Sequence, residues 1–138
     1  MQAGRGDVNL LQYRHAQKIL ERGVRQHYVY FILAESEDRS AIKIGTSTDP
    51  HGRLAAIRGD TTKRPDWVRA SPAQLRLHGW VNGDQELEKT LHLAFAKYRI
   101  VGEWFAYAPI GVAINCLLAQ WCLCPGCETE RMLNLAHI

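Results

Sequence analysis

The sequence predicts an α/β (α+β) domain in which three short strands form a small sheet flanked by helices. Two observations predict the sheet. Aromatic and branched aliphatic residues fill positions 28–33, and apolar residues alternate with small or charged ones at 41–45, on either side of a polar hairpin loop. A third observation predicts helices, because apolar residues recur every three or four positions in residues 84–99.

Length and composition indicate one ordinary globular domain. The chain has 138 residues, of which 46% are hydrophobic and 22% charged, enough to bury a core without disulfides. No apolar run approaches the roughly 20 residues of a membrane helix, and the first residues lack the layout of a signal peptide. We therefore expect a cytoplasmic protein with no membrane partner. The net charge of +3 does not by itself indicate a polyanionic partner.

The first predicted element is a helix that is capped by Asp7 and ends at about Arg22, within an N-terminal helical arm at residues 1–26. Leu11, His15 and Ile19 recur in it at four-residue spacing and predict its buried stripe. This N-terminal helical arm has three candidate roles: it packs on the domain, contacts a second copy of the chain, or faces nucleic acid. Packing is the simplest of them.

The predicted hairpin brings a phenol and an amine onto one surface. A register that pairs Ala34 with Ala41 across the loop places Tyr28, Tyr30 and Lys43 on one face of the sheet, because side chains alternate with a period of two.

A helix start follows the second strand. Asp49 is a suitable N-cap, and Pro50 occupies the first helical position, where proline is tolerated. The helix is expected to bury Leu54 and Ile57, while Arg53 lies off this apolar stripe near the N-terminal turn.

Basic residues gather after this helix start. Residues 61–72 contain prolines and predict an exposed loop. Over a slightly longer stretch two aspartates accompany six bases: Arg53, Arg58, Lys63, Arg64, Arg69 and Arg76. This stretch is either a positive patch that contacts a polyanion or an ordinary solvated loop.

A third strand and a strong helix come next. Residues 74–81 predict a strand with two leucines on one face and Arg76, His78 and Trp80 on the other. Asp84 caps the helix predicted at 84–99, whose buried stripe is Leu87, Leu91, Phe95 and Tyr98. Glu88 and His92 lie four residues apart beside this stripe, so their side chains are neighbours.

The C-terminal part combines an apolar helix with a cysteine tail, both expected to pack on the same domain. The helix is predicted at 109–121, after the segment Gly-Glu-Trp-Phe. All four cysteines lie here: Cys116, Cys122, Cys124 and Cys127. They form a zinc site, with Cys116 or His137 as the fourth ligand, or they are reduced thiols without metal, which one Cys-x-x-Cys alone does not exclude.

Five segments, taken in order, resemble the GIY-YIG nuclease superfamily. They are Tyr-Val-Tyr-Phe-Ile, Ile-Lys-Ile-Gly, Asp-Pro-x-x-Arg-Leu, Glu-x-x-x-His and Arg-Ile-Val-Gly-Glu-Trp-Phe. The resemblance is to the small phage and bacterial branch, in which Lys-Ile-Gly stands in place of Tyr-Ile-Gly and a Gly-Glu-Trp-Phe box follows. It implies a three-stranded antiparallel sheet flanked by helices. The expected domain spans 27–107, with a C-terminal helix and tail at 108–138.

The resemblance also implies a site. Tyr30 matches the tyrosine of the first motif, Lys43 takes the place of the second tyrosine, and Arg53 matches an arginine used near the scissile phosphate. Glu88 matches the glutamate that holds a divalent metal, Mg²⁺ or Mn²⁺, and His92 the histidine that follows it. The expected DNA contacts are Tyr28, Arg58, Lys63, Arg64 and Arg69.

The implied activity is metal-dependent hydrolysis of phosphodiester bonds in DNA, with one carboxylate and phosphate oxygens around a hard cation. Tyr30 would orient or deprotonate the attacking water, with positive charge from Lys43 lowering its pKa. Lys43 acts as a base only if its own pKa is depressed, so we expect it to hold phosphate. Each residue taken singly has a purely structural interpretation.

Two alternatives remain at this stage. One is a DNA-binding or regulatory module of the same fold, weak or inactive in catalysis because Lys43 replaces a tyrosine. The other is a protein-interaction domain that docks through its apolar last helix and cysteine tail. A homo-oligomer through the terminal helices fits either of them.

Overall fold

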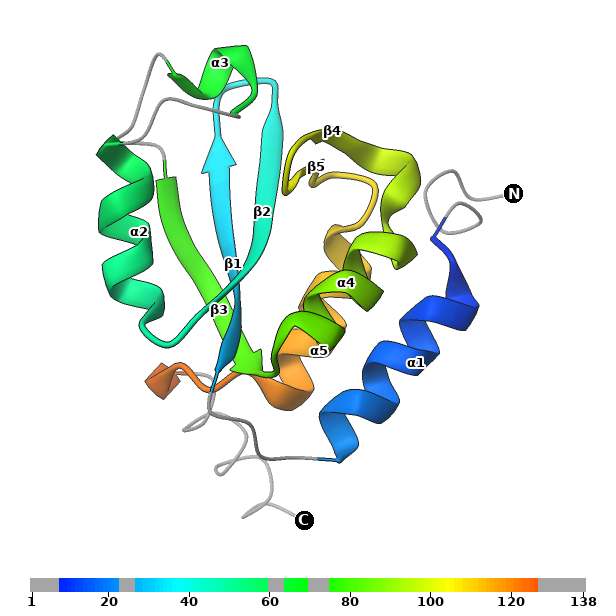
Figure 1. The fold of residues 1–138 in the computed structure, drawn as a ribbon. Coiled ribbons are helices and arrows are strands. Elements are labelled where there is room, and N and C mark those ends of the chain that lie inside the picture. Colours follow the sequence, from blue (N-terminus) through cyan, green and yellow to red (C-terminus); the bar gives the residue numbers. More distant parts are fainter. Residues whose placement is uncertain (1–7, 23–26, 60–63, 70–74, 127–138) are drawn as a thin grey trace.

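The computed structural model describes residues 8–22, 27–59, 64–69 and 75–126, which form an α+β fold (Figure 1). The helices are α1 (Leu10–Glu21), α2 (Pro50–Gly59), α3 (Asp66–Arg69), α4 (Gln85–Ala94) and α5 (Gly111–Trp121), with a 3-10 turn at Ala96–Tyr98. The strands are β1 (Tyr28–Glu35), β2 (Ser40–Ser47), β3 (Leu75–Asn82), β4 (Arg99–Val101) and β5 (Trp104–Ala106). No helix among these residues is both long and apolar enough to cross a membrane.

Within the described residues the sheet has five antiparallel strands in the order β3-β1-β2-β5-β4, so the prediction of three strands was wrong in number. The additional strands are only three residues long and flank a tight turn in which Gly102 has a φ of 56°. Alternation over three residues is too short to reveal a strand, whereas the left-handed conformation explains the glycine.

The predicted hairpin register is confirmed. Ala34 pairs with Ala41, Tyr30 with Gly45 and Ile32 with Lys43. Residues directly opposite each other point to the same face, so Tyr30 and Lys43 share one side of the sheet.

The third strand contains an irregularity that the sequence pattern does not show. The register between β1 and β3 shifts beside Phe31 and Ile32, so that Trp80 lies opposite Tyr30 and Leu77 opposite Ile32. The grouping of Trp80 with His78 on one face was therefore wrong, because the extra residue of a bulge reverses the alternation.

Both faces of the sheet are buried. Figure 1 shows α1, α4 and α5 on one side and α2 and α3 on the other. On the first side Val29, Phe31 and Leu33 pack in a core with residues of α1, α4 and α5. On the second side Tyr30 and Ile32 pack with residues of α2 and α3. Burial on both faces explains why the sequence of β1 is almost wholly apolar.

Three helix predictions needed correction. Asp7 lies outside the described residues, and α1 is capped by Asn9, whose side chain accepts from the backbone N–H of Gln12. Leu11 is 76% exposed, and the buried residues of α1 are Ala16, Ile19 and Leu20. Its apolar stripe thus lies about one residue further round the helix than predicted.

The other two corrections concern the end of α4 and the supposed loop. α4 ends at Ala94, because the chain tightens into the 3-10 turn although the apolar spacing continues to Tyr98. The segment predicted as an exposed loop contains α3, whose Val68 is buried in the second core.

Candidate active site

The site lies along the edge of β2 that β5 leaves uncovered. β5 pairs with β2 only from Ala41 to Lys43. Beyond this point the edge of β2 is satisfied differently: Ile44 N–H donates to the Glu103 carbonyl at 3.0 Å, and the Ile44 carbonyl lies 2.8 Å from Nε2 of His92. The Thr46 N–H donates to the Glu88 carboxylate. Because alternate residues direct their N–H and C=O groups to the same side, β2 brings these side chains together.

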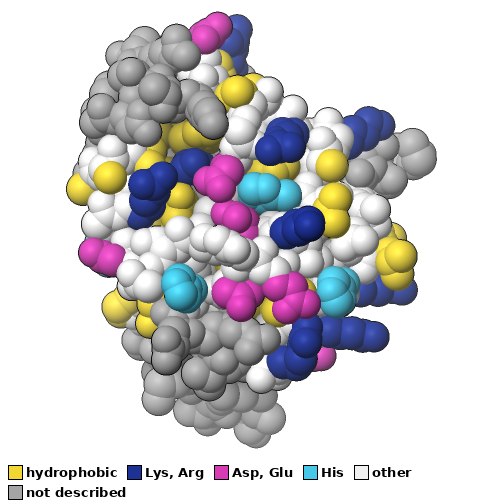
Figure 2. Space-filling model, viewed as in Figure 1, with side chains coloured by type: hydrophobic (Ala, Val, Ile, Leu, Met, Phe, Trp, Pro, Cys, Tyr) yellow, Lys and Arg dark blue, Asp and Glu magenta, His cyan; other side chains and the backbone are white. Residues whose placement is uncertain are grey.

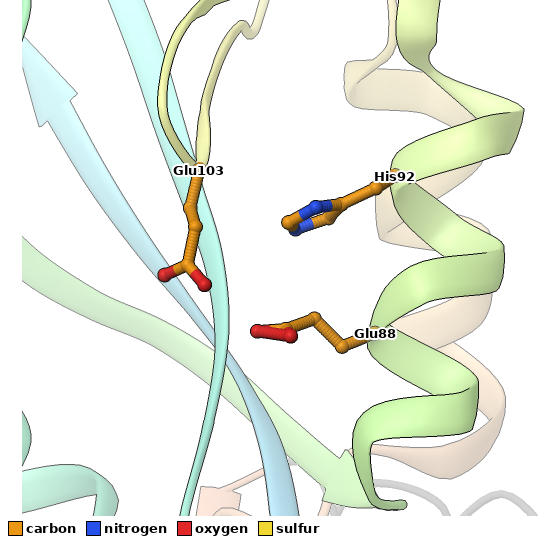
Figure 3. Close-up of side chains that lie close together, drawn as sticks. All are labelled: Glu88, His92 and Glu103. Atoms are coloured by element: carbon orange, nitrogen blue, oxygen red, sulfur yellow. The ribbon is translucent and has the colours of Figure 1, made fainter.

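Three ligand-type side chains form a compact group beside this edge. Glu88 and His92 extend from one face of α4 toward Glu103 on the β4–β5 turn (Figure 3). One ligand atom from each lies within 4.8 Å of the other two. Figure 2 shows acidic side chains and a histidine at the middle of this face, with lysine and arginine side chains on both sides.

The two carboxyl groups share a proton. Partial burial, followed by the hydrogen bond and the charge of Glu103, raises the pKa of Glu88 to about 7. Burial alone would raise the pKa of Glu103 too, but the hydrogen bond and charge of Lys43, and the bond from Glu88, hold it below its usual range. Near neutral pH Glu88 is therefore partly protonated, and in that form it donates a hydrogen bond to ionised Glu103. Two adjacent carboxylates require a proton or a cation.

Lys43 forms an ion pair with one member of this acidic pair. Its Nζ lies 2.8 Å from Oε1 of Glu103, and its side chain is only 12% exposed. The expectation that Lys43 lowers the pKa of Tyr30 was wrong: burial, opposed by the hydrogen bond from Arg53, raises the pKa of this phenol, and the charges of Glu103 and Glu88 add to the rise. Positive charge reaches the phenol from Arg53 instead.

Tyr30 and Arg53 lie next to the Glu103 carboxylate, since a Cβ at Gly45 would contact both the Tyr30 hydroxyl and Oε1 of Glu103. The Arg53 Nε donates to the Tyr30 hydroxyl at 3.5 Å. Arg53 lies in the first turn of α2, which Asp49 caps as predicted by accepting from Gly52 N–H at 3.1 Å. The Tyr30 ring lies across Gly45, where an added Cβ would be only 2.3 Å from the hydroxyl oxygen. Glycine therefore leaves room for the tyrosine.

These groups line one open depression of about 500 Å³. Tyr30, Arg53, Glu88 and Glu103 share it with Thr46, Ser47 and Thr48 and with His27 and Gln85. Such a polar surface, with carboxylates on one wall and a guanidinium on another, suits a substrate that carries phosphates.

His92 has a structural role beside the depression. Burial lowers its pKa, so the imidazole is neutral near pH 7. A carbonyl only accepts hydrogen bonds, so Nε2 carries the proton donated to Ile44 and leaves Nδ1 as an acceptor. The ring also packs against Phe105, with centroids 5.0 Å apart.

The predicted DNA contacts are not brought together in the same way. Tyr28 is half-buried at the start of β1. Arg64 is only 3% exposed and donates to the carbonyl of Ile57, so its assignment as a surface contact was wrong. Lys63 and the side chains of Arg58 and Arg69 lie outside the described residues.

The cysteine tail is only partly described. The Sγ atoms of Cys122 and Cys124 are 3.3 Å apart, while Cys116 is exposed on α5. Cys127 and His137 lie outside the described residues. A zinc site that includes these cysteines therefore stays a prediction, tested by metal analysis of protein purified without chelator.

Glu103 is the site residue that the sequence interpretation missed. It stands in the Gly-Glu-Trp-Phe segment, between a glycine and two residues that become fully buried, Trp104 and Phe105. A charged residue held in a tight turn beside a buried pair was the available signal. Its partners could not be inferred without the positions of β4 and β5.

Comparisons with known proteins identify a domain family for most of the chain. A family model described as the T5orf172 domain matches residues 27–122, well over half of the chain. No curated protein and no solved structure matches the chain.

Proposed function

The chain belongs to the T5orf172 domain family, which is associated with phage and bacterial nuclease-like proteins, and from this premise we propose that it is a divalent-metal-dependent endonuclease that hydrolyses phosphodiester bonds in DNA. One observation carries the proposal. The carboxyl groups of Glu88 and Glu103 and the pair formed by Tyr30 and Arg53 line the same open depression.

The donor set fits a hard divalent cation. Glu88 and Glu103 share one proton between adjacent carboxyl groups, a position that a cation can take when both ionise. Oxygen ligands suit Mg²⁺ and Mn²⁺, so these two carboxylates would hold the ion. When bound, it would neutralise phosphate charge and lower the pKa of bound water. The imidazole of His92, engaged with the Ile44 carbonyl, keeps α4 against β2.

Arg53 and Tyr30 would bind the phosphate and orient the attacking water. The planar guanidinium of Arg53 can form paired hydrogen bonds with a phosphate, and its position in the first turn of α2 adds the favourable helix dipole. Tyr30 keeps its proton at neutral pH because its pKa is raised, so its hydroxyl orients the attacking water rather than deprotonating it.

The test compares nicking of plasmid DNA by two matched variants. Glu88→Gln removes the carboxylate from the group, whereas Glu86→Gln removes one from the exposed side of the same helix. With Mg²⁺ we expect Glu88→Gln to lose about a hundredfold or more in rate and Glu86→Gln to stay near the wild type. Equal rates for the wild type and Glu88→Gln would contradict the proposal.

A second candidate function is DNA binding without cleavage. The ion pair between Lys43 and Glu103 favours it, because a carboxylate already neutralised within the chain has less need of a metal ion. This candidate predicts salt-sensitive DNA binding, no Mg²⁺-dependent nicking and no effect of Glu88→Gln.

A further inference from the structure

We propose that Lys43 acts as an internal counter-ion of the Glu88–Glu103 pair, so that a divalent cation binds strongly only together with a phosphate group of the substrate. The inference rests on the proposed function because it concerns regulation of the same site. Lys43 is here a positioning residue, since it acts through Glu103.

The geometry places Lys43 behind Glu103 rather than in the path of a substrate. Its Nζ is 2.8 Å from Oε1 of Glu103. In the described part of the chain, Glu103 lines the open depression and Lys43 does not. The ammonium group is also less exposed than the carboxylate that it contacts, with side-chain exposures of 12% and 36%. A lysine placed to hold phosphate would instead line the depression.

The neighbours of Lys43 keep it there. In the sheet it lies between Ile32 of β1 and Trp104 of β5, both almost completely buried. The side chain of Lys43 is only 12% exposed, so water cannot fully hydrate its ammonium group. Breaking the ion pair with Glu103 would therefore leave a poorly hydrated charge without a partner, which costs free energy. The charge is therefore a fixed property of the site.

A fixed positive charge weakens binding of a cation at the adjacent carboxylates. The ammonium cancels part of the negative charge of Glu88 and Glu103, and it repels a divalent ion across a short, partly buried distance. A phosphodiester in the depression restores the missing negative charge. Metal and phosphate then strengthen each other's binding, and the two effects are equal because the coupling is reciprocal.

The first experiment measures Mn²⁺ affinity of the full chain without DNA, from the electron paramagnetic resonance signal of the free ion. Lys43→Met removes the charge and keeps the length of the side chain, and Lys43→Arg retains the charge. Lys89→Met is the control, since Lys89 is exposed on α4 next to Glu88. We expect Lys43→Met to bind Mn²⁺ roughly tenfold more tightly, and the other two variants to resemble the wild type.

The second experiment measures the coupling. Mn²⁺ affinity is compared with and without a short DNA duplex, in a Tyr30→Phe background that limits cleavage. DNA should increase the affinity clearly in the presence of Lys43 and much less in Lys43→Met. Equal Mn²⁺ affinities for Lys43→Met and Lys89→Met would overturn the inference while leaving the metal site intact. Equal Mn²⁺ affinities for the wild type and Glu88→Gln would remove the proposed metal site itself.

Discussion

The close contact between Gly45 and Tyr30 shows how one residue without a side chain shapes the site. The phenol ring lies over Gly45 of β2, and its hydroxyl accepts a hydrogen bond from Arg53. No larger residue fits this position unless the ring moves. The glycine of the Lys-Ile-Gly segment is therefore explained by packing, without an unusual backbone angle.

Gly45→Ala should accordingly destabilise the protein and displace Tyr30. An alanine Cβ would lie 2.3 Å from the hydroxyl oxygen and 2.6 Å from Cζ. Overpacking of this kind costs about 1–3 kcal/mol in the free energy of unfolding, measurable by urea denaturation. The control is the same substitution in a Tyr30→Leu background, where the cost should largely disappear. An unchanged cost there would show that the ring is not the obstacle.

Glu88 provides a prediction on pH. Its pKa is raised to about 7 in the folded protein, above its ordinary value of 4.5. The stabilisation from the bound proton is thus fully present below the unfolded pKa and is lost as pH rises through about 7. Without metal, the free energy of unfolding of the wild type should fall from pH 6 to pH 9 relative to Glu88→Gln, by about 1–2 kcal/mol once partial hydration is allowed for.

Glu86→Gln, on the exposed side of α4, is the matched control for that measurement. It should follow the pH dependence of the wild type, and His92 is unchanged in all three proteins. If the Glu88→Gln difference is the same at both pH values, the two carboxyl groups do not share a proton.

At the residue scale, the sequence predicted which residues belong to the site better than it predicted which side chains they contact. Period-two alternation correctly placed Tyr30 and Lys43 on one face. It could not show that Lys43 bonds to Glu103 rather than assisting Tyr30, because that choice depends on a turn 60 residues away in the sequence. Arg64 illustrates the same limit, since its burial depends on contacts between α2 and the segment that precedes α3.

At the scale of elements, the site depends on the position of α4, whose side chains bond to the edge of β2 where no strand of the described residues pairs with it. The long periodic segments were predictable: the stripe of α4 and the hairpin register both follow from repeated patterns. The short elements were not. β4 and β5 have three residues each, and the bulge in β3 involves one residue, too little for any periodic signal.

The N-caps of α4 and α1 give a paired prediction at this scale. The Asp84 side chain accepts from Glu86 N–H at 3.0 Å, and the Asn9 side chain accepts from Gln12 N–H at 3.2 Å. Replacing either by alanine should cost about 1 kcal/mol in the free energy of unfolding. Only Asp84→Ala should also weaken Mn²⁺ binding, because α4 carries Glu88 and α1 carries no residue of the site.

Thermal denaturation and the Mn²⁺ titration described above test both variants. A loss of Mn²⁺ affinity in Asn9→Ala as large as in Asp84→Ala would mean that general stability, and not the position of α4, governs the site.

At the scale of the whole molecule, the depression lies where the two cores meet. Tyr30 belongs to the core on the side of α2 and α3, whereas α4 packs in the core on the other side. A sheet edge left open between two helical layers lets groups from both sides reach one substrate. This arrangement explains why neither core alone contains the site and why no single stretch of sequence encodes it.

The distribution of positive charge over the molecule leads to a last prediction, on DNA binding without metal. Arg53 lines the open depression, but Arg64 is buried, and in the described part of the chain its Nε and Nη1 atoms have no hydrogen-bond partner. Arg53→Gln should therefore reduce the slope of log K against log salt concentration by about one, where K is the association constant for DNA, as expected for one lost phosphate contact.

Arg64→Met is the matched control. It should leave the slope unchanged and alter only the free energy of unfolding. Filter binding of one duplex at several salt concentrations, together with urea denaturation, separates these effects. A reduced slope for Arg64→Met would return this residue to the DNA-binding surface that the sequence alone had suggested.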